Sequence, residues 1–183
     1  GPAWIDVPAN IQMAMIDPSE IKDDFEASEL QHGPDPDFQV KVQQSADLLK
    51  RSKRPLMLAG HGVRLSGSAS LFMSIAERHG IPVMTTWNGD DCVPSDHELF
   101  AGRPGTFASR AANFGIQNSD LLISIGSRLP FPVTGYNSKD FARNAKKIMV
   151  DIDKIEINRS NVNLDEKINC DASYFLKSLL KYL

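Results

Sequence analysis

The sequence lacks the residue patterns that mark metal centres, disulfide frameworks and membrane spans. It contains only two cysteines, Cys92 and Cys170, and four histidines, and neither set shows the spacing of a metal or redox motif. We therefore expect two buried free thiols in a reducing compartment, with the cytoplasm as the default location. No apolar run approaches the ~20 residues of a membrane-spanning helix, so no membrane partner is expected.

Motifs of common reaction centres are also missing. The sequence has no Gly-x-Ser-x-Gly nucleophile elbow, no zinc spacing and no phosphate-binding loop ending in Gly-Lys-Ser/Thr. The formal net charge is −3, and no block or stripe of Lys and Arg stands out, which argues against a nucleic-acid partner. We therefore expect this chain to hold no catalytic residue and no metal site of its own.

The sequence does contain a repeated pattern in which a short apolar run stops at a small or polar residue. Such runs, separated by helical patterns, are typical of parallel strands covered by helices on both faces. They predict a three-layer α/β/α, Rossmann-like domain with a parallel sheet of about six strands. The runs are 55–59, 81–86, 99–101, 120–125, 148–152 and 167–170.

Apolar residues at helical spacing predict the helices between these strands. In the third helix we expect Phe107, Ala111 and Phe114 to face the sheet. The expected helices cover 38–52, 66–79, 106–118 and the stretch after 170.

The first part of the sequence has a different character from the rest. Ala3–Pro8 reads as a strand halted by proline, so we expect residues 1–12 to be the tail of a preceding domain. Residues 13–37 contain Asp-Pro and Gly-Pro dipeptides, which favour turns and loops, and are expected to be a linker. Residues 38–183 are expected to form the central Rossmann-like domain.

Candidate site residues stand where the predicted strands end, since ligands of such sheets bind at the carboxyl ends of the strands. Gly60-His61-Gly62 follows the first strand, where glycines serve either as a phosphate cradle or only as a tight turn. Arg128 is placed to reach a phosphate or is a solvated loop residue, and Asp151 is placed to accept hydrogen bonds from ribose hydroxyls. Trp87 either stacks on a flat ring or packs.

Four stretches resemble the central domain of thiamine-diphosphate-dependent enzymes of the acetolactate synthase type: 1–12, 54–62, 118–128 and 150–153. The resemblance implies a structural, non-catalytic domain of a carboligase or decarboxylase that acts on a 2-oxo acid such as pyruvate. It also implies that flanking pyrimidine- and diphosphate-binding domains of the same chain hold thiamine diphosphate and Mg²⁺. A homodimer or homotetramer is the implied assembly.

In the biosynthetic synthases the central domain holds FAD in a structural role. Their run Gly-x-Arg-Phe-Asp-Asp-Arg-Val-Thr-Gly corresponds here to 126–135, where both acids and the second arginine are replaced. We therefore expect no FAD in this domain as purified, and another nucleotide or none in its place. Position by position, the resemblance assigns cofactor binding to Gly60, His61, Gly62, Thr86, Trp87, Arg103, Gly126, Arg128, Asp151, Ile152 and Asp171.

Two alternative functions stay open at this point. An NAD-dependent dehydrogenase domain would use Gly60 and Gly62, but its fingerprint needs a third glycine where Leu65 stands. It also needs an acid after the second strand, where Thr85 and Thr86 stand. The other alternative is a structural interaction module with a vestigial nucleotide crevice.

Overall fold

A computed structural model of the protein describes residues 4–20 and 34–183. The chain divides into two compact units, Gly1–His32 and Gly33–Leu183, and each is described by itself. In the described parts of both units, no helix is long and apolar enough to cross a membrane.

The described residues of the first unit form two short helices, α1 (Ala9–Gln12) and η1 (Pro18–Glu20). The strand expected over 3–8 is wrong for residues 4–8, which have no regular structure. The described residues of this unit, 4–20, include no other strand with which they could pair. Trp4 and Ile5 are 92% and 84% exposed. Residues 1–3 of the expected tail and 21–33 of the expected linker lie outside the described residues.

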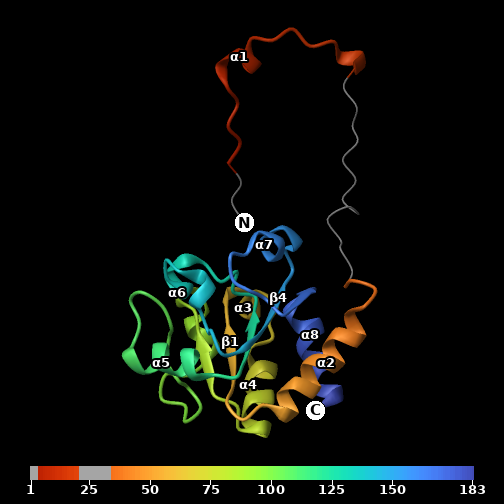
Figure 1. The fold of residues 1–183 in the computed structure, drawn as a ribbon. Coiled ribbons are helices and arrows are strands. Elements are labelled where there is room, and N and C mark those ends of the chain that lie inside the picture. The colour runs from red at the N-terminus through yellow and green to blue at the C-terminus, as the bar shows by residue number, and fades with distance from the viewer. Residues whose placement is uncertain (1–3, 21–33) are drawn as a thin grey trace. The chain divides into compact units, whose positions relative to one another are not determined.

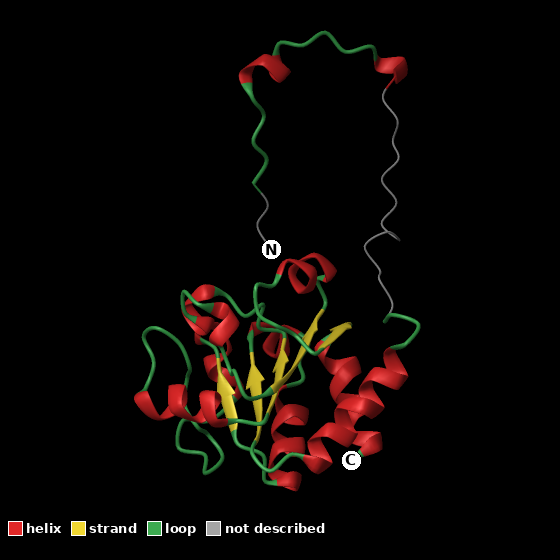
Figure 2. Cartoon of the chain, viewed as in Figure 1, coloured by secondary structure: helices red, strands yellow, loops and turns green. Residues whose placement is uncertain are grey.

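The second unit is built on a five-stranded parallel sheet in the order β2-β1-β3-β4-β5 (Figures 1 and 2). Segment 99–101, expected as a sixth strand, forms only a single bridge between Val83 and Phe100 at the edge of β2. Gly102 follows it at φ +94° and turns the chain away from the edge. The strands are β1 (Pro55–Ala59), β2 (Val83–Thr85), β3 (Leu121–Ile125), β4 (Lys146–Asp151) and β5 (Glu166–Asn169).

Helices cover both faces of this sheet, which makes the predicted three-layer α/β/α sandwich. Met57 and Ala59 of β1 belong to an apolar cluster with α2, α4 and α8, whereas Leu56 and Leu58 belong to a second cluster with α5, α6 and α7. The helices are α2 (Phe38–Arg51), α3 (His61–Leu65), α4 (Ala69–His79), η3 (Trp87–Cys92), α5 (Arg110–Asn118), α6 (Phe131–Thr134), η4 (Ser138–Asp140), α7 (Lys154–Arg159) and α8 (Ala172–Tyr182).

Two of the expected helices differ from those observed. The helix expected over 66–79 is preceded by the short α3, and the two are separated by a turn at Gly67, whose φ is +65°. The helix expected over 106–118 begins only at Arg110, because the hydroxyl of Ser109 caps it by accepting the Ala112 amide at 3.2 Å.

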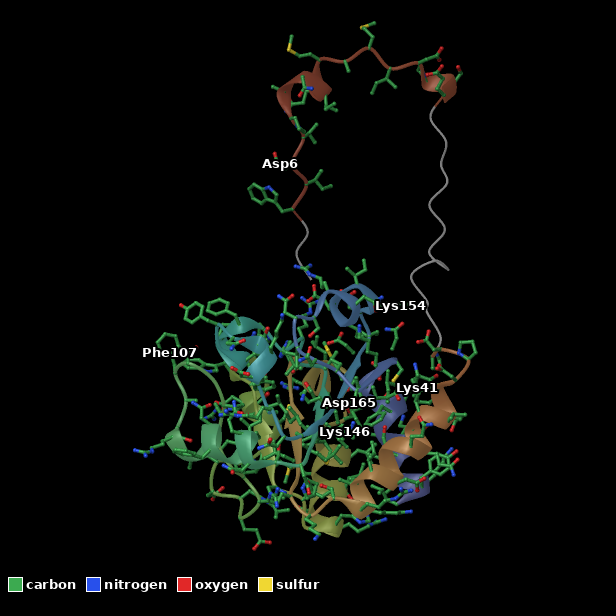
Figure 3. The ribbon with its side chains drawn as sticks, viewed as in Figure 1. Asp6, Lys41, Phe107, Lys146, Lys154 and Asp165 are labelled. Carbon is green, nitrogen blue, oxygen red and sulfur yellow. The ribbon has the colours of Figure 1, made fainter. Side chains whose placement is uncertain are left out.

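The expectation that Phe107, Ala111 and Phe114 face the sheet is also wrong. Ala112 and Ile116 are the buried residues of α5, while Phe114 is 55% exposed. Phe107 is 78% exposed and lies in the loop before the helix (Figure 3). The face of α5 that packs on the sheet carries Ala112 and Ile116, one i, i+4 pair offset from the positions assumed from the sequence.

The strand order places a topological switch between β1 and β3. From β1 the chain crosses to β2 on one side of β1, and from β2 it crosses to β3 on the other side, so the connections that leave β1 and β3 run in opposite directions. In parallel sheets a crevice opens between such loops, at the carboxyl ends of the strands.

Candidate functional site

The turns after β1 and β3 pack directly against each other through glycines. A Cβ at Gly126 would lie 2.6 Å from the Cα of Gly62, and one at Gly62 would lie 2.7 Å from the Cα of Gly126. A Cβ at Gly60 would fall onto the carbonyl oxygen of Gly126. Gly126 also has φ +59°, a conformation that residues with a Cβ rarely adopt. Only glycine fits at these three positions.

The amides of these glycines hold the turns to the sheet. The Gly60 amide donates to the carbonyl of Ile125 and the Gly62 amide to that of Gly126, both at 2.9 Å. The Gly126 amide donates to the carbonyl of Val150 at 2.8 Å. Because all three donors have backbone partners, the tight-turn interpretation explains the glycines, and these amides are not presented to a phosphate.

A crevice of about 890 Å³ opens above the interlocked turns, at the switch point of the sheet. Strands β1, β2, β3 and β4 each contribute the residues that follow them, and the start of α8 closes one side. The predicted site residues that line it are His61, Gly62, Thr86, Trp87, Gly126, Arg128, Asp151, Ile152 and Asp171. The structure thus brings most of the predicted set together.

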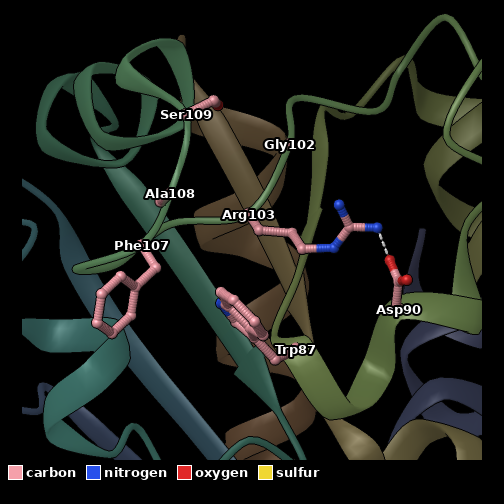
Figure 4. Close-up of a pocket in the computed structure, with 7 residues that line it drawn as sticks. All are labelled: Trp87, Asp90, Gly102, Arg103, Phe107, Ala108 and Ser109. Carbon is pink, nitrogen blue, oxygen red and sulfur yellow. Dashed lines mark ion pairs between the residues drawn. The ribbon is translucent and has the colours of Figure 1, made fainter.

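Two predicted site residues lie elsewhere. Gly60 packs behind Gly126 and does not line the crevice. Arg103 lines a neighbouring pocket of about 370 Å³, where its guanidinium is ion-paired with Asp90 (Figure 4). The same guanidinium lies 5.5 Å from the centre of the Phe100 ring. Arg103 therefore has local partners outside the crevice.

Trp87 connects the two cavities, because it lines both of them. Its ring meets the Phe107 ring edge to face, with centroids 6.3 Å apart and an interplanar angle of 76°. The indole nevertheless stays 60% exposed, so packing and stacking on a ligand are both compatible with its position.

Two of the lining residues have well-defined structural partners. His61 Nδ1 lies 2.7 Å from the carbonyl oxygen of Asn88, which ties α3 to η3. Asp171 caps α8, since its Oδ1 accepts the amide of Ser173 at 2.8 Å and the hydroxyl of Ser173 at 2.6 Å. These contacts account for both side chains without a ligand.

Arg128 occupies the centre of an unusual turn. Arg128 and Leu129 have φ values of +55° and +47°, and a left-handed conformation costs a residue with a Cβ roughly 1–2 kcal/mol. The Leu129 amide closes the turn by donating to the carbonyl of Ser127 at 2.7 Å, and the Leu129 side chain is buried. The Arg128 side chain is 63% exposed, and its guanidinium lies 4.0 Å from the Asp153 carboxylate.

Asp151 ends β4 and is 5% exposed, although its side chain lines the crevice. Its Oδ1 accepts the amide of Asp153 at 3.0 Å. Burial raises the pKa of the Asp151 carboxyl above its ordinary value, and the Asp153 amide and the Arg128 guanidinium oppose this only in part. The carboxylate is therefore costly to hold in the folded state at neutral pH.

Asp151→Asn tests this electrostatic cost. The folded protein binds the Asp151 proton more tightly than the unfolded chain does, so stability falls as pH rises from the ordinary carboxyl range through the raised pKa. We expect the amide variant to be more stable than wild type at pH 7 and equally stable near pH 3, measured by urea unfolding. Asp96→Asn, at an exposed carboxyl, is the charge control. Equal destabilisation of Asp151→Asn at both pH values would contradict the prediction.

The sequence analysis missed further residues that line the crevice. Glu156 and Arg159 belong to α7, which was not expected, and their side chains form an ion pair at 3.1 Å. The available signal was Asp153, whose carboxylate caps α7 by accepting the amides of Ile155 and Glu156 at 2.9 and 3.3 Å. Cys170 also lines the crevice, and burial raises the pKa of its thiol to about 12.

No cluster of three or more His, Cys, Asp or Glu side chains suited to a metal ion occurs in residues 4–20 and 34–183. Both cysteines are buried free thiols, as expected.

Comparison with known proteins matches residues 42–179 to the thiamine pyrophosphate enzyme, central domain, family. This match covers most of the chain. The chain belongs to this family. It therefore shares the fold and the domain type that the resemblance implied, and the NAD-dependent dehydrogenase alternative gains no support.

Similar proteins include acetolactate synthase large subunits. The chain is 37% identical to the probable acetolactate synthase large subunit of Methanococcus aeolicus and 32% identical to the acetolactate synthase large subunit of Lactococcus lactis. It is 31% identical to the glyoxylate carboligase of Escherichia coli O157:H7. The alignments cover 100%, 99% and 87% of this chain but only 30%, 31% and 26% of those relatives. The chain thus spans less than a third of the length of these relatives.

Proposed function

We propose that this chain is the non-catalytic central domain of a longer thiamine-diphosphate-dependent carboligase or decarboxylase that acts on a 2-oxo acid such as pyruvate. In this proposal, flanking pyrimidine- and diphosphate-binding domains hold thiamine diphosphate and Mg²⁺, and the whole protein assembles as a homodimer or homotetramer in the cytoplasm. The family match and the similarity to acetolactate synthase large subunits support this role.

The crevice at the switch point is the observation that supports a ligand-binding role for this domain. Its volume of about 890 Å³ accommodates a nucleotide, and Arg128 supplies an exposed guanidinium beside it. The second arginine of the lining, Arg159, is paired with Glu156 at 3.1 Å. We propose a nucleotide whose phosphate contacts Arg128. The replaced acids and arginine of 126–135 disfavour tight binding of FAD.

Calorimetry on this chain with three ligands tests the proposal. We expect binding of ADP, no stoichiometric binding of FAD, and no binding of thiamine diphosphate in the presence of Mg²⁺. Arg128→Gln should weaken ADP binding about ten- to a hundredfold, as expected for a lost charge-assisted contact. Arg78→Gln, at an exposed arginine of α4, is the matched control and should leave ADP affinity unchanged.

Three outcomes would count against this assignment. Micromolar, magnesium-dependent binding of thiamine diphosphate would show that the chain holds the reactive cofactor itself. If the purified protein is yellow and contains about one flavin per chain, the ligand of the crevice is FAD and not the proposed nucleotide. If Arg128→Gln leaves the ADP affinity unchanged, Arg128 does not contact the phosphate of the nucleotide.

A further inference from the structure

Two buried serines are hydrogen-bonded to each other at the crevice, whose lining includes Ser127 but not Ser124. The hydroxyls of Ser124, in β3, and Ser127, in the turn that follows, lie 2.7 Å apart. Ser124 is 1% exposed and Ser127 is 8% exposed. In the sheet, Ser124 lies beside Leu58 and Met149, both of which belong to the second apolar cluster. The hydroxyl pair is therefore set against an apolar part of the core.

A buried hydroxyl is costly unless it has a hydrogen-bond partner, so each serine restrains the other. Rotating the Ser127 side chain out of the pair would leave the Ser124 hydroxyl in apolar surroundings. The pair thus links the rigid centre of the sheet to the first side chain of the turn after Gly126.

The same turn carries Arg128, which lines the crevice and has a strained backbone conformation. Ser127 accepts the Leu129 amide through its carbonyl at 2.7 Å, and its Oγ lies 3.4 Å from the same amide. Arg128 lies between these two residues at φ +55° and is not a glycine. Such a conformation persists only where its surroundings hold it. Gly126 is held against Gly62 on one side, and buried Leu129 anchors the other.

We infer that Ser127 is a positioning residue: through its buried hydrogen bond to Ser124 it holds the turn that presents the Arg128 guanidinium to a phosphate group in the crevice. This inference rests on the proposed nucleotide-binding function. Ser127 itself also lines the crevice, and the role assigned to it acts through the position of Arg128. Ser124 is the hydrogen-bond partner that this role requires, so the two serines act as one unit.

The first test measures ADP affinity by calorimetry. Ser127→Ala should weaken ADP binding about tenfold, and Ser124→Ala should do the same without altering the turn residue itself. The double variant should be no weaker than either single variant, because both remove one interaction. Ser45→Ala is the matched control. Ser45 is also 1% exposed and its hydroxyl donates to the Lys41 carbonyl at 2.8 Å in α2, away from the crevice lining.

The second test needs no ligand. Burial raises the pKa of Asp151, the Asp153 amide and both the charge and the backbone amide of Arg128 partly lower it again, and the Asp153 charge raises it. The titration of Asp151 therefore responds to a displacement of the turn that carries Arg128. Carbon-13 NMR of the carboxyl groups should show a higher Asp151 pKa in Ser127→Ala and Ser124→Ala than in wild type. The direction should match that of Arg128→Gln, and Ser45→Ala should cause no change.

The outcomes separate the inference from the function on which it rests. If wild type fails to bind ADP, the nucleotide role is refuted, and the Asp151 titration decides the positioning inference alone. If ADP binds and Arg128→Gln weakens it, but both serine variants keep wild-type affinity and the wild-type Asp151 pKa, the positioning inference is overturned. If the serine variants lose stability but keep the wild-type ADP affinity and the wild-type Asp151 pKa, the serine pair is a structural contact only and the positioning inference is again overturned.

Discussion

Gly126→Ala is expected to destabilise the protein by about 2–5 kcal/mol, the sum of a left-handed backbone cost and overpacking. The new methyl group would lie 2.6 Å from the Cα of Gly62, and backbone atoms cannot move aside as a flexible side chain can. The turns after β1 and β3 would have to separate, and the hydrogen bond from the Gly62 amide to the Gly126 carbonyl would weaken. Urea unfolding followed by circular dichroism measures the loss.

Gly67→Ala is the matched control for this variant. Gly67 has φ +65°, close to the +59° of Gly126, but no atom lies within 4 Å of the position of its added Cβ. Its cost is therefore limited to about 1–2 kcal/mol of backbone strain. Gly60→Ala supplies the converse case, with a clash against Gly126 but no positive φ. Equal losses in Gly126→Ala and Gly67→Ala would show that the close packing of the turns adds nothing.

Phe175→Ala is expected to cost about 3–5 kcal/mol, the usual range for removing a buried aromatic ring. Phe175 lies in α8, has no exposed surface and belongs to the apolar cluster that joins α2, α4 and α8 to the sheet. Single domains have only about 5–15 kcal/mol of stability in total, so this variant should lose a large part of it. The measurement is the shift in the urea midpoint.

Tyr174→Ala controls for the loss of an aromatic residue from the same helix. Tyr174 is 60% exposed, and we expect its removal to shift the midpoint far less than that of Phe175. If the two variants shift the urea midpoint by similar amounts, helix propensity and not core packing determines how much Phe175 contributes to stability.

The periodicity of the sequence was sufficient for the five strands of the sheet and for several helices, but it also predicted strands at 3–8 and 99–101, and residues 4–8 and 99–101 do not form them. The helical spacing of Val42, Ala46 and Leu49 supports the helix expected over 38–52, and all three are buried in α2; Phe175 and Leu179 are likewise buried in α8. These predictions succeeded because a parallel sheet covered on both faces forces continuous apolar runs into its strands. The prediction failed for Phe107 because the Ser109 cap starts α5 after it, and for Phe114 because the buried face of α5 carries Ala112 and Ile116.

The candidate site was predictable in its residues but not in their roles. Arg128 and Asp151 follow strands that a doubly wound sheet brings to one edge, so their convergence follows from topology. The Gly60 and Gly62 amides, in contrast, donate to the carbonyls of Ile125, the last residue of β3, and Gly126, in the turn that follows, more than sixty residues away in the sequence. No local pattern identifies such a partner.

By itself, the sequence determined the α/β class, the positions of the parallel strands and the resemblance to a central domain of thiamine-diphosphate-dependent enzymes, a family that the comparison confirmed. These features rest on local spacing and on motif residues, which can be read along the chain. Only the tertiary structure decided that Gly126 interlocks with Gly62, that Arg103 pairs with Asp90 outside the crevice, and that Ser127 is bonded to Ser124. Such contacts depend on how side chains and turns from separate strands pack, which spacing alone does not specify.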